Sequence, residues 1–537
     1  MLNYVWFSLV ILGILAGVSY DIKDSVSDTY RNGKAITVTL TQTSGKDSLH
    51  PRLSIQSAAF NTFYGSNLQN DVVADVQLSH KQGNEYTLFM KTDNATPEVW
   101  QTIAGSSGKA NDISGSVFIQ AKDSLGNAIA LLTLDQTRFV KVKEITNASL
   151  DYAETAVKIA LGLIGIMAMW LGVMKVAEEA GLIKLIAKAL TPVTKFLFPS
   201  VPSDHPAMGS MIMNISANFL GLGNAATPFG LKAMQELDTL NTNKGTASDP
   251  MVMFLAINTA GLNLIPATAI AVRAASGSAD PAAIIGTTIF GSACATTTAI
   301  ILGKTAEAFL GTSQVSQAEK KSLFKKLGII AVVLAVIIAS ISLGVFNSLS
   351  SYFGNSGSSV FKDVISTLSV LAIPTLITIF MTYGLVKKVK VYETFVEGAK
   401  EGFNTAIRII PYLVAMLMAI GIFRAGGAMD WLITILMPVT NFIGMPAEAL
   451  PMALMRPLSG SGSLGIMTEI ISVHGADSFM GMLVSTFYGS TETTFYVLAV
   501  YFGSVNIKNT RHALPLGLLA DVAGILGALF IVKLLFG

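Results

Sequence analysis

Two short stretches of this sequence are nearly identical: Leu190–Phe196 reads LTPVTKF, and Leu436–Phe442 reads LMPVTNF. Each copy follows an apolar segment and an amphipathic stretch that begins at a glycine, Gly181 or Gly427. Each copy is followed by a Gly-, Ser- and Asn-rich apolar segment, an apolar segment with a polar centre, and a final apolar segment. The repetition predicts a chain built from two related halves.

The composition places those halves in a membrane. Of the 537 residues, 51% are hydrophobic and 13% are charged, whereas soluble domains are about 25% charged. The net charge of +2 gives no reason to expect a nucleic-acid partner. The single cysteine, Cys294, excludes disulfides and thiolate metal clusters within one chain. We expect a polytopic protein of the bacterial cytoplasmic membrane, with lipid as a partner and a homo-oligomer as an option.

Nearly uncharged runs recur along the chain, and each has to cross ~30 Å of hydrocarbon at ~1.5 Å per residue. They predict an all-α membrane core of about nine transmembrane helices. The predicted spans are Leu2–Val18, Ala160–Met174, Val252–Val272, Ala282–Leu302, Leu327–Phe346, Val364–Val386, Ile409–Phe423, Phe479–Val505 and Leu514–Val532.

Residues 20–146 differ from the rest of the chain because they are polar and alternate with a period of two. The alternation is clear in Ala35–Leu40 and in Ser116–Gln120, and turn signals such as Ser44-Gly45 separate the runs. We therefore expect a small β-rich domain inserted after the first span. It contains no cluster of His, Cys or paired carboxylates, so binding or assembly is its expected role.

Lysine-rich loops set the expected topology. Lysines follow the fourth and sixth predicted spans, as at Lys304 and Lys387, whereas 347–361 carries no charge before Lys362. The positive-inside rule puts the basic loops in the cytoplasm. The N-terminus is then cytoplasmic and residues 20–146 are extracytoplasmic. The first span could also be a signal peptide, but it lacks a basic leader region, so we expect a retained anchor.

The two Gly-rich segments, Met208–Gly230 and Leu450–Met467, are apolar enough for membrane depth but contain helix breakers. Broken backbone at that depth is tolerated inside protein or along a wet cavity. We expect two re-entrant hairpins, which leave an odd number of crossings between the halves and so predict an inverted repeat. The expected parts are an anchor at 1–19, the β domain at 20–146, a first repeat at 147–310, a two-helix linker at 311–390 and a second repeat at 391–537.

Polar side chains gather at four related places, the two hairpins and the two polar-centred spans. One interpretation is a substrate site near the midplane, and the other is that small polar residues only let helices pack. The candidate substrate-binding residues are Asn214, Asn218, Asn224, Thr227, Asn258, Thr259, Asn263, Arg456, Ser459, Ser461, Ser490, Thr491, Glu492 and Thr493.

Two charges are costly at this depth, Arg456 and Glu492. A charge at the bilayer centre costs at least ~2.5–3.5 kcal/mol and needs a partner or a role. In a structural interpretation they form an ion pair that only clamps the hairpin, or Arg456 snorkels to the membrane surface. In the other, Arg456 holds an anionic group of a solute and Glu492 couples transport to H⁺ or Na⁺. Asp521, in the last span, faces the same choice with fewer arguments in its favour.

The same motifs carry a family resemblance. Asp204–Ser210 and Gly221–Met234 resemble spore maturation protein A, and Leu454–Gly462, Gly489–Tyr496 and Thr510–Pro515 resemble spore maturation protein B. The two families belong to the nucleoside-recognition or Gate group, similar to concentrative nucleoside transporters and the membrane part of ferrous-iron transporter B. The resemblance implies a Gate repeat in each half and a transport role, with A and B fused and residues 20–146 added.

These arguments predict a secondary-transporter-like protein that moves a small polar or anionic solute through a midplane site. A membrane scaffold or regulator of envelope or spore maturation, acting through the external β domain, is the alternative. We expect no enzyme, because no nucleophile–base pair, phosphate loop or zinc motif is present. No cofactor and no metal site are expected.

Overall fold

The computed structural model describes residues 2–41, 49–93, 95–106, 112–122, 127–221, 223–310, 328, 332, 336 and 358–537. It divides into two compact units. One unit combines Phe7–Asp151 with Gly421–Trp431, and the other combines Met1–Trp6, Tyr152–Ile420 and Leu432–Gly537.

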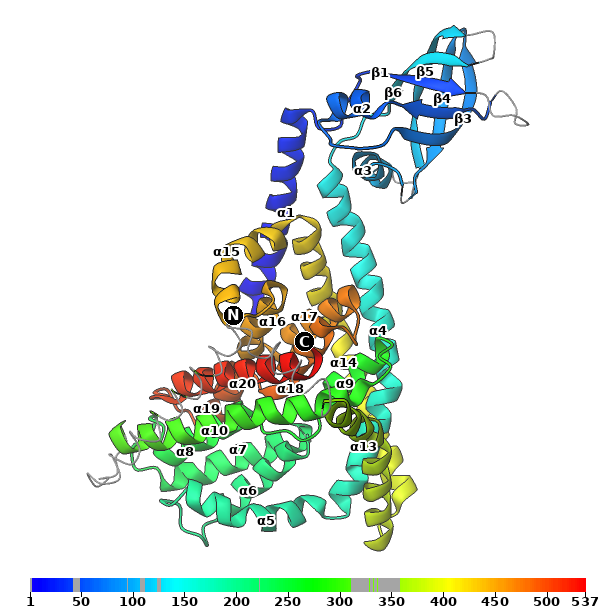
Figure 1. Ribbon diagram of the computed structural model, residues 1–537. Helices are drawn as coiled ribbons and strands as arrows, with labels where there is room; N and C mark the ends of the chain where they lie inside the picture. The colour runs from blue at the N-terminus through cyan, green and yellow to red at the C-terminus, as the bar shows by residue number, and fades with distance from the viewer. Residues whose placement is uncertain are drawn as a thin grey trace. The chain divides into compact units, whose positions relative to one another are not determined.

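The first unit contains a closed barrel of six antiparallel strands in the order β1 to β6, with β1 also paired to β6 (Figure 1). Apolar side chains at alternate positions, such as Val38 and Leu40 of β1, point into the barrel and are buried, while the threonines between them are exposed. The strands are β1 Ile36–Thr41, β2 Arg52–Ile55, β3 Val72–Gln82, β4 Glu85–Lys91, β5 Asp112–Lys122 and β6 Ala128–Leu134.

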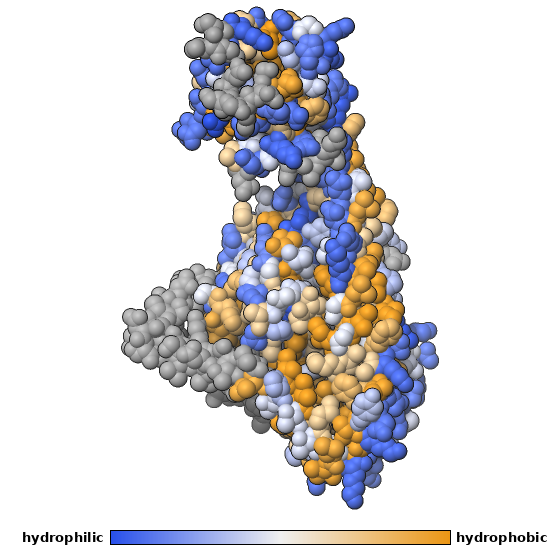
Figure 2. Space-filling model, turned by 90° about the vertical axis from the view of Figure 1, so that its right-hand side faces the viewer, coloured by the Kyte–Doolittle hydropathy of each residue, from blue (hydrophilic) through white to orange (hydrophobic). Residues whose placement is uncertain are grey.

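Two short helices, α2 (Ser57–Tyr64) and α3 (Glu98–Ser106), complete the core of the barrel. Phe60 of α2 and Trp100 of α3 are fully buried, with ring centroids 5.5 Å apart. The prediction of a small β-rich domain within residues 20–146 is therefore confirmed. Figure 2 shows a mainly hydrophilic surface over this domain and broad hydrophobic areas over the helices.

A long helix precedes the barrel in the chain, and another follows it. The N-terminal helix α1 spans Leu2–Ser27, and α4 runs without interruption from Val140 to Glu179. Between the helices and the strands, the Asn32 amide donates to Thr137 O (2.9 Å) and accepts from Thr137 N (2.8 Å). These two hydrogen bonds join the two ends of the barrel segment. The ends therefore lie close together, as is typical of an inserted domain.

The second unit is helical, and its elements follow the same order twice. Each half has a long helix, an amphipathic helix, a helix pair, a broken helix and a final long helix. The first half comprises α4, α5 (Leu182–Leu197), α6 (Pro206–Phe219), α7 (Gly223–Leu240), α8 (Asp249–Ala260), α9 (Ala267–Ala275), η1 (Pro281–Ala283) and α10 (Ile284–Leu310). After α13 (Ser358–Val386), the second half comprises α14 (Val391–Ala425), α15 (Ala428–Ile443), η2 (Ala447–Ala449), α16 (Leu450–Leu458), α17 (Gly460–His474), α18 (Phe479–Ser490), α19 (Thr494–Gly503) and α20 (Ala513–Phe536).

Five helices among the described residues are long and apolar enough to cross a membrane, and the chain is a multi-pass membrane protein. They correspond to the first, second, fourth, seventh and ninth predicted spans: Trp6–Ser27, Val140–Glu179, Pro281–Phe309, Val391–Ala425 and Ala513–Phe536. The sixth predicted span lies within α13, of which Ile373–Val386 is a shorter apolar helix. The fifth, Leu327–Phe346, lies outside the described residues except for three positions. The total of nine stays a prediction.

The third and eighth predicted spans differ from expectation because neither is one continuous helix. Val252–Val272 divides into α8 and α9 around Gly261–Pro266, and Phe479–Val505 divides into α18 and α19 around Thr491–Thr493. Gly261 ends α8 with a φ of +59°, and Pro266 precedes α9, so the local residue types explain the first break. Asn258 therefore lies just before one break, and Glu492 lies within the other.

The two predicted hairpins are helix pairs. α6 and α7 meet at Gly221, where φ is +79°, and α16 and α17 meet at Ser459. Ser459 is extended and caps α17 by accepting a hydrogen bond from Gly462 N at 3.0 Å. The breaks thus lie close to Gly221 and Gly460, as predicted, whereas Pro228 lies inside α7 and Pro457 inside α16. The re-entrant course of the pairs through a membrane stays a prediction.

The final helices of the two halves, α10 and α20, pack closely along each other (Figure 1). A Cβ at Gly291 would lie 3.3 Å from Ala528 Cβ, and one at Gly303 would lie 3.4 Å from Leu516 Cδ2. Residue numbers rise on α10 as they fall on α20, so the equivalent helices are antiparallel. α8 and α18 pack against this pair.

Candidate functional site

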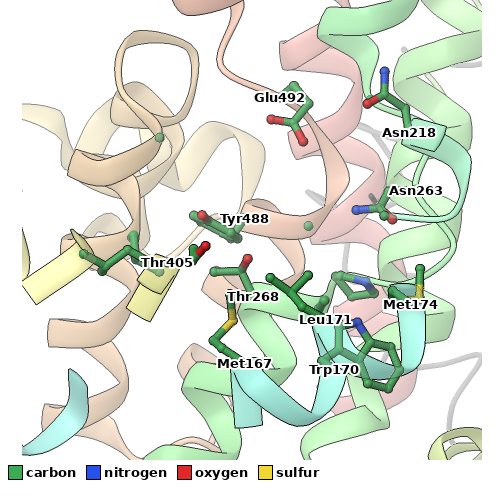
Figure 3. Close-up of a pocket in the computed structure, with 18 of the residues that line it drawn as sticks. Met167, Trp170, Leu171, Met174, Asn218, Asn263, Thr268, Thr405, Tyr488 and Glu492 are labelled. Carbon is green, nitrogen blue, oxygen red and sulfur yellow. The ribbon is translucent and has the colours of Figure 1, made fainter. Parts of the chain in front are cut away.

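A cavity of about 370 Å³ lies between the two halves of the helical unit. Its lining comes from both helix pairs, from both helix breaks, and from the long helices α4 and α14. Figure 3 shows Asn218, Asn263 and Glu492 toward one side of the cavity, and the α4 side chains Trp170 and Met174 toward the other. The cavity therefore combines polar and apolar lining groups, which suits a small molecule with both kinds of surface.

Arg456, in the last turn of α16, is the buried cation of the site, with 4% of its side chain exposed. Its guanidinium donates to the Thr491 carbonyl and to Thr493 Oγ1 (3.4 Å), and it lies over the Tyr488 ring, 4.5 Å from the centroid. Its Nε is buried with no hydrogen-bond partner among the described residues. One donor therefore remains for a further acceptor.

Glu492 lies in the break between α18 and α19, and its Oε2 is 3.6 Å from Arg456 Nη2. Its side chain is 48% exposed, whereas the sequence placed it as a buried charge halfway along a helix. The break explains the difference, because an extended segment turns the side chain into the cavity. The backbone N–H of Glu492 donates to Thr259 O at 2.9 Å, so the break of one half is bonded to the break of the other.

The beginning of α17 supplies a further positive end. Gly460 and Ser461 line the cavity in the first turn of this 15-residue helix. The N-terminal N–H groups of a helix carry a partial positive charge. Arg456 and this helix end therefore place positive charge in the second half's wall, beside the carboxylates Glu401 and Glu492 of the same half.

Two amides from the first half, Asn218 and Asn263, line the cavity. Asn218 of α6 donates to Asn258 Oδ1 at 2.8 Å, and Tyr501 of α19 donates to the same oxygen at 3.3 Å. Asn263, in the break after α8, accepts from Ile265 N at 3.1 Å. Asn214 is buried below this layer, where it donates to Ala226 O and to Tyr501 Oη. These amides hold the hairpin against both broken helices.

The cavity brings together a subset of the predicted site residues. The ones that line it are Asn218, Asn263, Arg456, Ser461 and Glu492. The other predicted residues with described side chains do not line the cavity: Asn214, Thr227, Asn258, Thr259, Ser459, Ser490, Thr491 and Thr493. Asn224 lies in the first turn of α7, with its side chain outside the described residues. A substrate role for each stays a prediction.

Several lining residues were not predicted from the sequence. Lys175 and Glu178 of α4 form an ion pair at 3.3 Å, and Glu401 of α14 joins them in the lining. The sequence could have indicated these three charged residues, since charges close to a predicted span need a partner. The aromatic lining residues Trp170, Tyr412 and Tyr488 had no comparable signal, because only the tertiary fold brings them to the cavity.

Asp521 of α20 is buried and does not line the cavity. Its Oδ2 accepts from Thr494 Oγ1 at 2.6 Å, and its Oδ1 has no partner within the described part of the chain. The carboxyl therefore joins α20 to the first turn of α19.

The lining combines two cations, Lys175 and Arg456, with three carboxylates, Glu178, Glu401 and Glu492. An enclosure of this kind can bind a solute that has both an anionic and a cationic or hydrogen-bonding group, because each charge finds an opposite partner. The aromatic and methionine side chains of α4 can cover the apolar part of such a solute.

Comparisons with known proteins agree with this architecture. The Gate family model, described as nucleoside recognition, matches residues 160–308 and 406–508, one segment in each half. The chain is similar to spore maturation protein B of Bacillus subtilis (strain 168), with 52% identity over 175 residues, which are 33% of this chain and 98% of that protein. It is also similar to spore maturation protein A of the same strain, with 43% identity over 163 residues, 30% of this chain and 83% of that protein. No solved structure matches the chain.

Proposed function

We propose that this chain, which belongs to the family of spore maturation proteins A and B, is a secondary-transporter-like membrane protein. Its solute is a small polar or anionic molecule that binds in the cavity between the two helix pairs. The observation that carries the proposal is the buried Arg456 guanidinium, which lines the cavity with its Nη2 3.6 Å from Glu492. A guanidinium in a cavity can bind a carboxylate or phosphate oxygen of a solute by charge-assisted hydrogen bonds.

The ion-coupling role goes to Glu492. Its half-exposed carboxylate lies 3.6 Å from Arg456 and faces the cavity. A carboxylate beside a solute-binding guanidinium can take a proton or a Na⁺ as the solute arrives, which links the two binding events. Transport by alternating access then needs two states in which the cavity opens to opposite sides.

The proposed topology has an inverted repeat in the cytoplasmic membrane, a cytoplasmic N-terminus and an extracytoplasmic barrel. Antiparallel packing of α10 and α20 supports it, since an inverted repeat requires equivalent helices to run in opposite directions. A reporter inserted in the barrel should be active only outside the cytoplasm, and one at Lys388 only inside. Activity of both reporters on one side would contradict the inversion.

The transport proposal is tested with the purified full chain in proteoliposomes. Uptake of labelled uridine, glutamate and inorganic phosphate is measured with an imposed H⁺ or Na⁺ gradient. We expect uptake of at least one probe by the native chain, and a loss of at least about tenfold for Arg456→Ala, since charge-assisted hydrogen bonds contribute ~1.5–3 kcal/mol. Arg456→Lys keeps the charge but loses the planar fork, so it should recover only part of the affinity.

Glu154→Gln is the matched control. Glu154 lies on α4 in an exposed ion pair with Lys158, outside the cavity lining, so its loss should leave uptake unchanged. Normal uptake by Arg456→Ala would show that transport does not use this cavity. No uptake of any probe under either gradient would count against a transporter of these solute classes.

A further inference from the structure

Helix α5 presents three exposed lysines on one line. Lys184, Lys188 and Lys195 are all exposed and are four and seven residues apart, so they lie on the same side of the helix. Among the described residues, none of the three forms an ion pair. We call these residues the lysine row. Three neighbouring like charges without a partner repel one another, which indicates an anionic partner outside this part of the chain.

A second exposed row on α5 is apolar. Leu185 is 54% exposed, Val193 49% and Phe196 67%. The opposite side of the helix, with Ile183 and Leu197, is buried against the helical core. The helix therefore has three sides: one in the core, one cationic and one apolar but uncovered. This pattern is typical of a helix that lies in a membrane interface, with its apolar side among acyl chains and its cations at phosphate level.

Helix α15 occupies the same place in the second half and supplies an internal comparison. Its exposed apolar row is retained, with Ile435 72% and Phe442 70% exposed. Counting from the equivalent prolines Pro192 and Pro438, the positions of the lysine row hold Asp430, Thr434 and Asn441. The two helices therefore share an apolar side, and only α5 has the cations.

We propose that α5 lies in the membrane interface and binds anionic phospholipid headgroups through the lysine row. The charge difference between α5 and α15 carries this assignment, because an apolar row alone suits any acyl chain. Anionic lipid is concentrated in the cytoplasmic leaflet and attracts basic segments at its surface. The lysine row thus assigns α5 to that leaflet. The proposal does not depend on which solute, if any, the cavity binds.

The test is native mass spectrometry of the full chain, released from detergent with added phosphatidylglycerol or phosphatidylcholine of identical acyl chains. The native chain should retain phosphatidylglycerol in preference. The triple variant Lys184→Gln, Lys188→Gln and Lys195→Gln should lose at least about tenfold of that preference, since each lysine near an anionic surface contributes severalfold. Replacing the same three lysines by arginine should restore the preference, because the positive charges are kept.

Two further variants separate a local site from general charge. Changing three exposed barrel lysines, Lys81, Lys91 and Lys122, to glutamine removes the same charge from another place and should leave lipid preference unchanged. Changing Asp430, Thr434 and Asn441 to lysine should create a second phosphatidylglycerol site on α15. Equal losses in the α5 and barrel variants would overturn the proposal. So would an unchanged preference in a normally folded α5 variant, judged by its thermal unfolding in detergent.

Discussion

Arg273 Nη2 lies 2.8 Å from Asp477 Oδ1, and this ion pair joins the end of α9 in one half to the turn before α18 in the other. Arg273 also donates to the Ala476 carbonyl. A corresponding contact runs from the second half to the first. Arg511, in the turn before α20, donates to Asp249 Oδ1 (2.6 Å) and to Ala247 O (3.1 Å) at the start of α8. In each half, therefore, an arginine binds the beginning of the broken helix of the other half.

Replacing Arg273 by methionine should destabilise the helical unit. The guanidinium is fully buried and also bonds Pro281 O and Asp280 O, so its loss leaves several acceptors unpaired. We expect a cost toward the lower end of the ~3–5 kcal/mol seen when one partner of a buried pair is removed, since Asp477 is partly exposed and can rehydrate. Thermal unfolding in detergent measures it.

The matched change is Lys158→Met, which removes a cation from the exposed pair with Glu154. It should shift the melting temperature little, because exposed pairs contribute ~0–1 kcal/mol. Equal shifts in both variants would mean that the buried arginine has no special structural role.

Acid should weaken the same contact. Partial burial acts to raise the pKa of the Asp477 carboxyl, but hydrogen bonds from Ser278 Oγ and Ala279 N and the charge of Arg273 outweigh it, and the pKa is lowered. A carboxyl whose folded pKa is lowered stabilises the fold above its unfolded pKa of ~3.9, and that stability is lost as the pH falls through the folded pKa.

Asp477→Asn should therefore flatten the decline of melting temperature below about pH 4. Ser278→Ala, which keeps the carboxylate but removes one hydrogen bond, should move the decline to higher pH. A native profile that matches Asp477→Asn throughout this range would show that the carboxylate contributes no pH-dependent stability.

Gly261 should not tolerate a side chain. Its φ is +59°, and an added Cβ would lie 2.9 Å from Glu492 Cγ and 3.1 Å from Glu492 N. Gly277 also has a positive φ, +80°, but a Cβ there would meet nothing within 4 Å. Gly277→Ala should therefore cost only the ~1–2 kcal/mol of the left-handed backbone, whereas Gly261→Ala should cost more and separate the two breaks. Thermal unfolding of the two variants in parallel decides it, and equal costs would show that the contact with Glu492 is easily relieved.

The helix pairs, the barrel and the two halves could be predicted from the sequence, because glycine, proline, alternation and repetition are local signals. The breaks at Gly261 and Thr491 were missed, since each lies within a long uncharged run and hydropathy does not register a change of backbone direction. Gly261 with Pro266 was the available signal at the first break. The cavity wall from α4 and α14 could not be predicted, because Trp170 and Glu401 meet the hairpins only through contacts distant in sequence.

The barrel should fold when excised, because its six strands close on one another and Asn32 joins its two ends through Thr137. We expect residues 30–138 to give a cooperative thermal transition by circular dichroism, and Asn32→Ala to lower its midpoint. Deleting Lys34–Lys141 from the full chain should still yield a folded membrane core. Recovery of no folded core after that deletion would show that insertion depends on the barrel.

The last prediction separates a structural from a coupling role for Glu492. Arg456 keeps the Thr491 carbonyl, Thr493 and the Tyr488 ring when Glu492 is changed, and the Glu492 side chain is 48% exposed. Glu492→Gln should therefore cost less than ~1 kcal/mol, because the half-exposed carboxylate is hydrated and Arg456 keeps its other partners. If the pair were a buried clamp, the cost would approach ~3–5 kcal/mol, and replacing both residues by apolar ones would recover much of it.

For coupling, the Glu492→Gln variant should bind the transported probe but lose the dependence of binding on pH or Na⁺, because its amide cannot take a proton or balance a cation. Isothermal calorimetry at two pH values, with and without Na⁺, measures this beside the melting temperature. A stable Glu492→Gln protein with unchanged ion dependence would remove the coupling role, and a strongly destabilised one rescued by the double change would return the pair to a clamp.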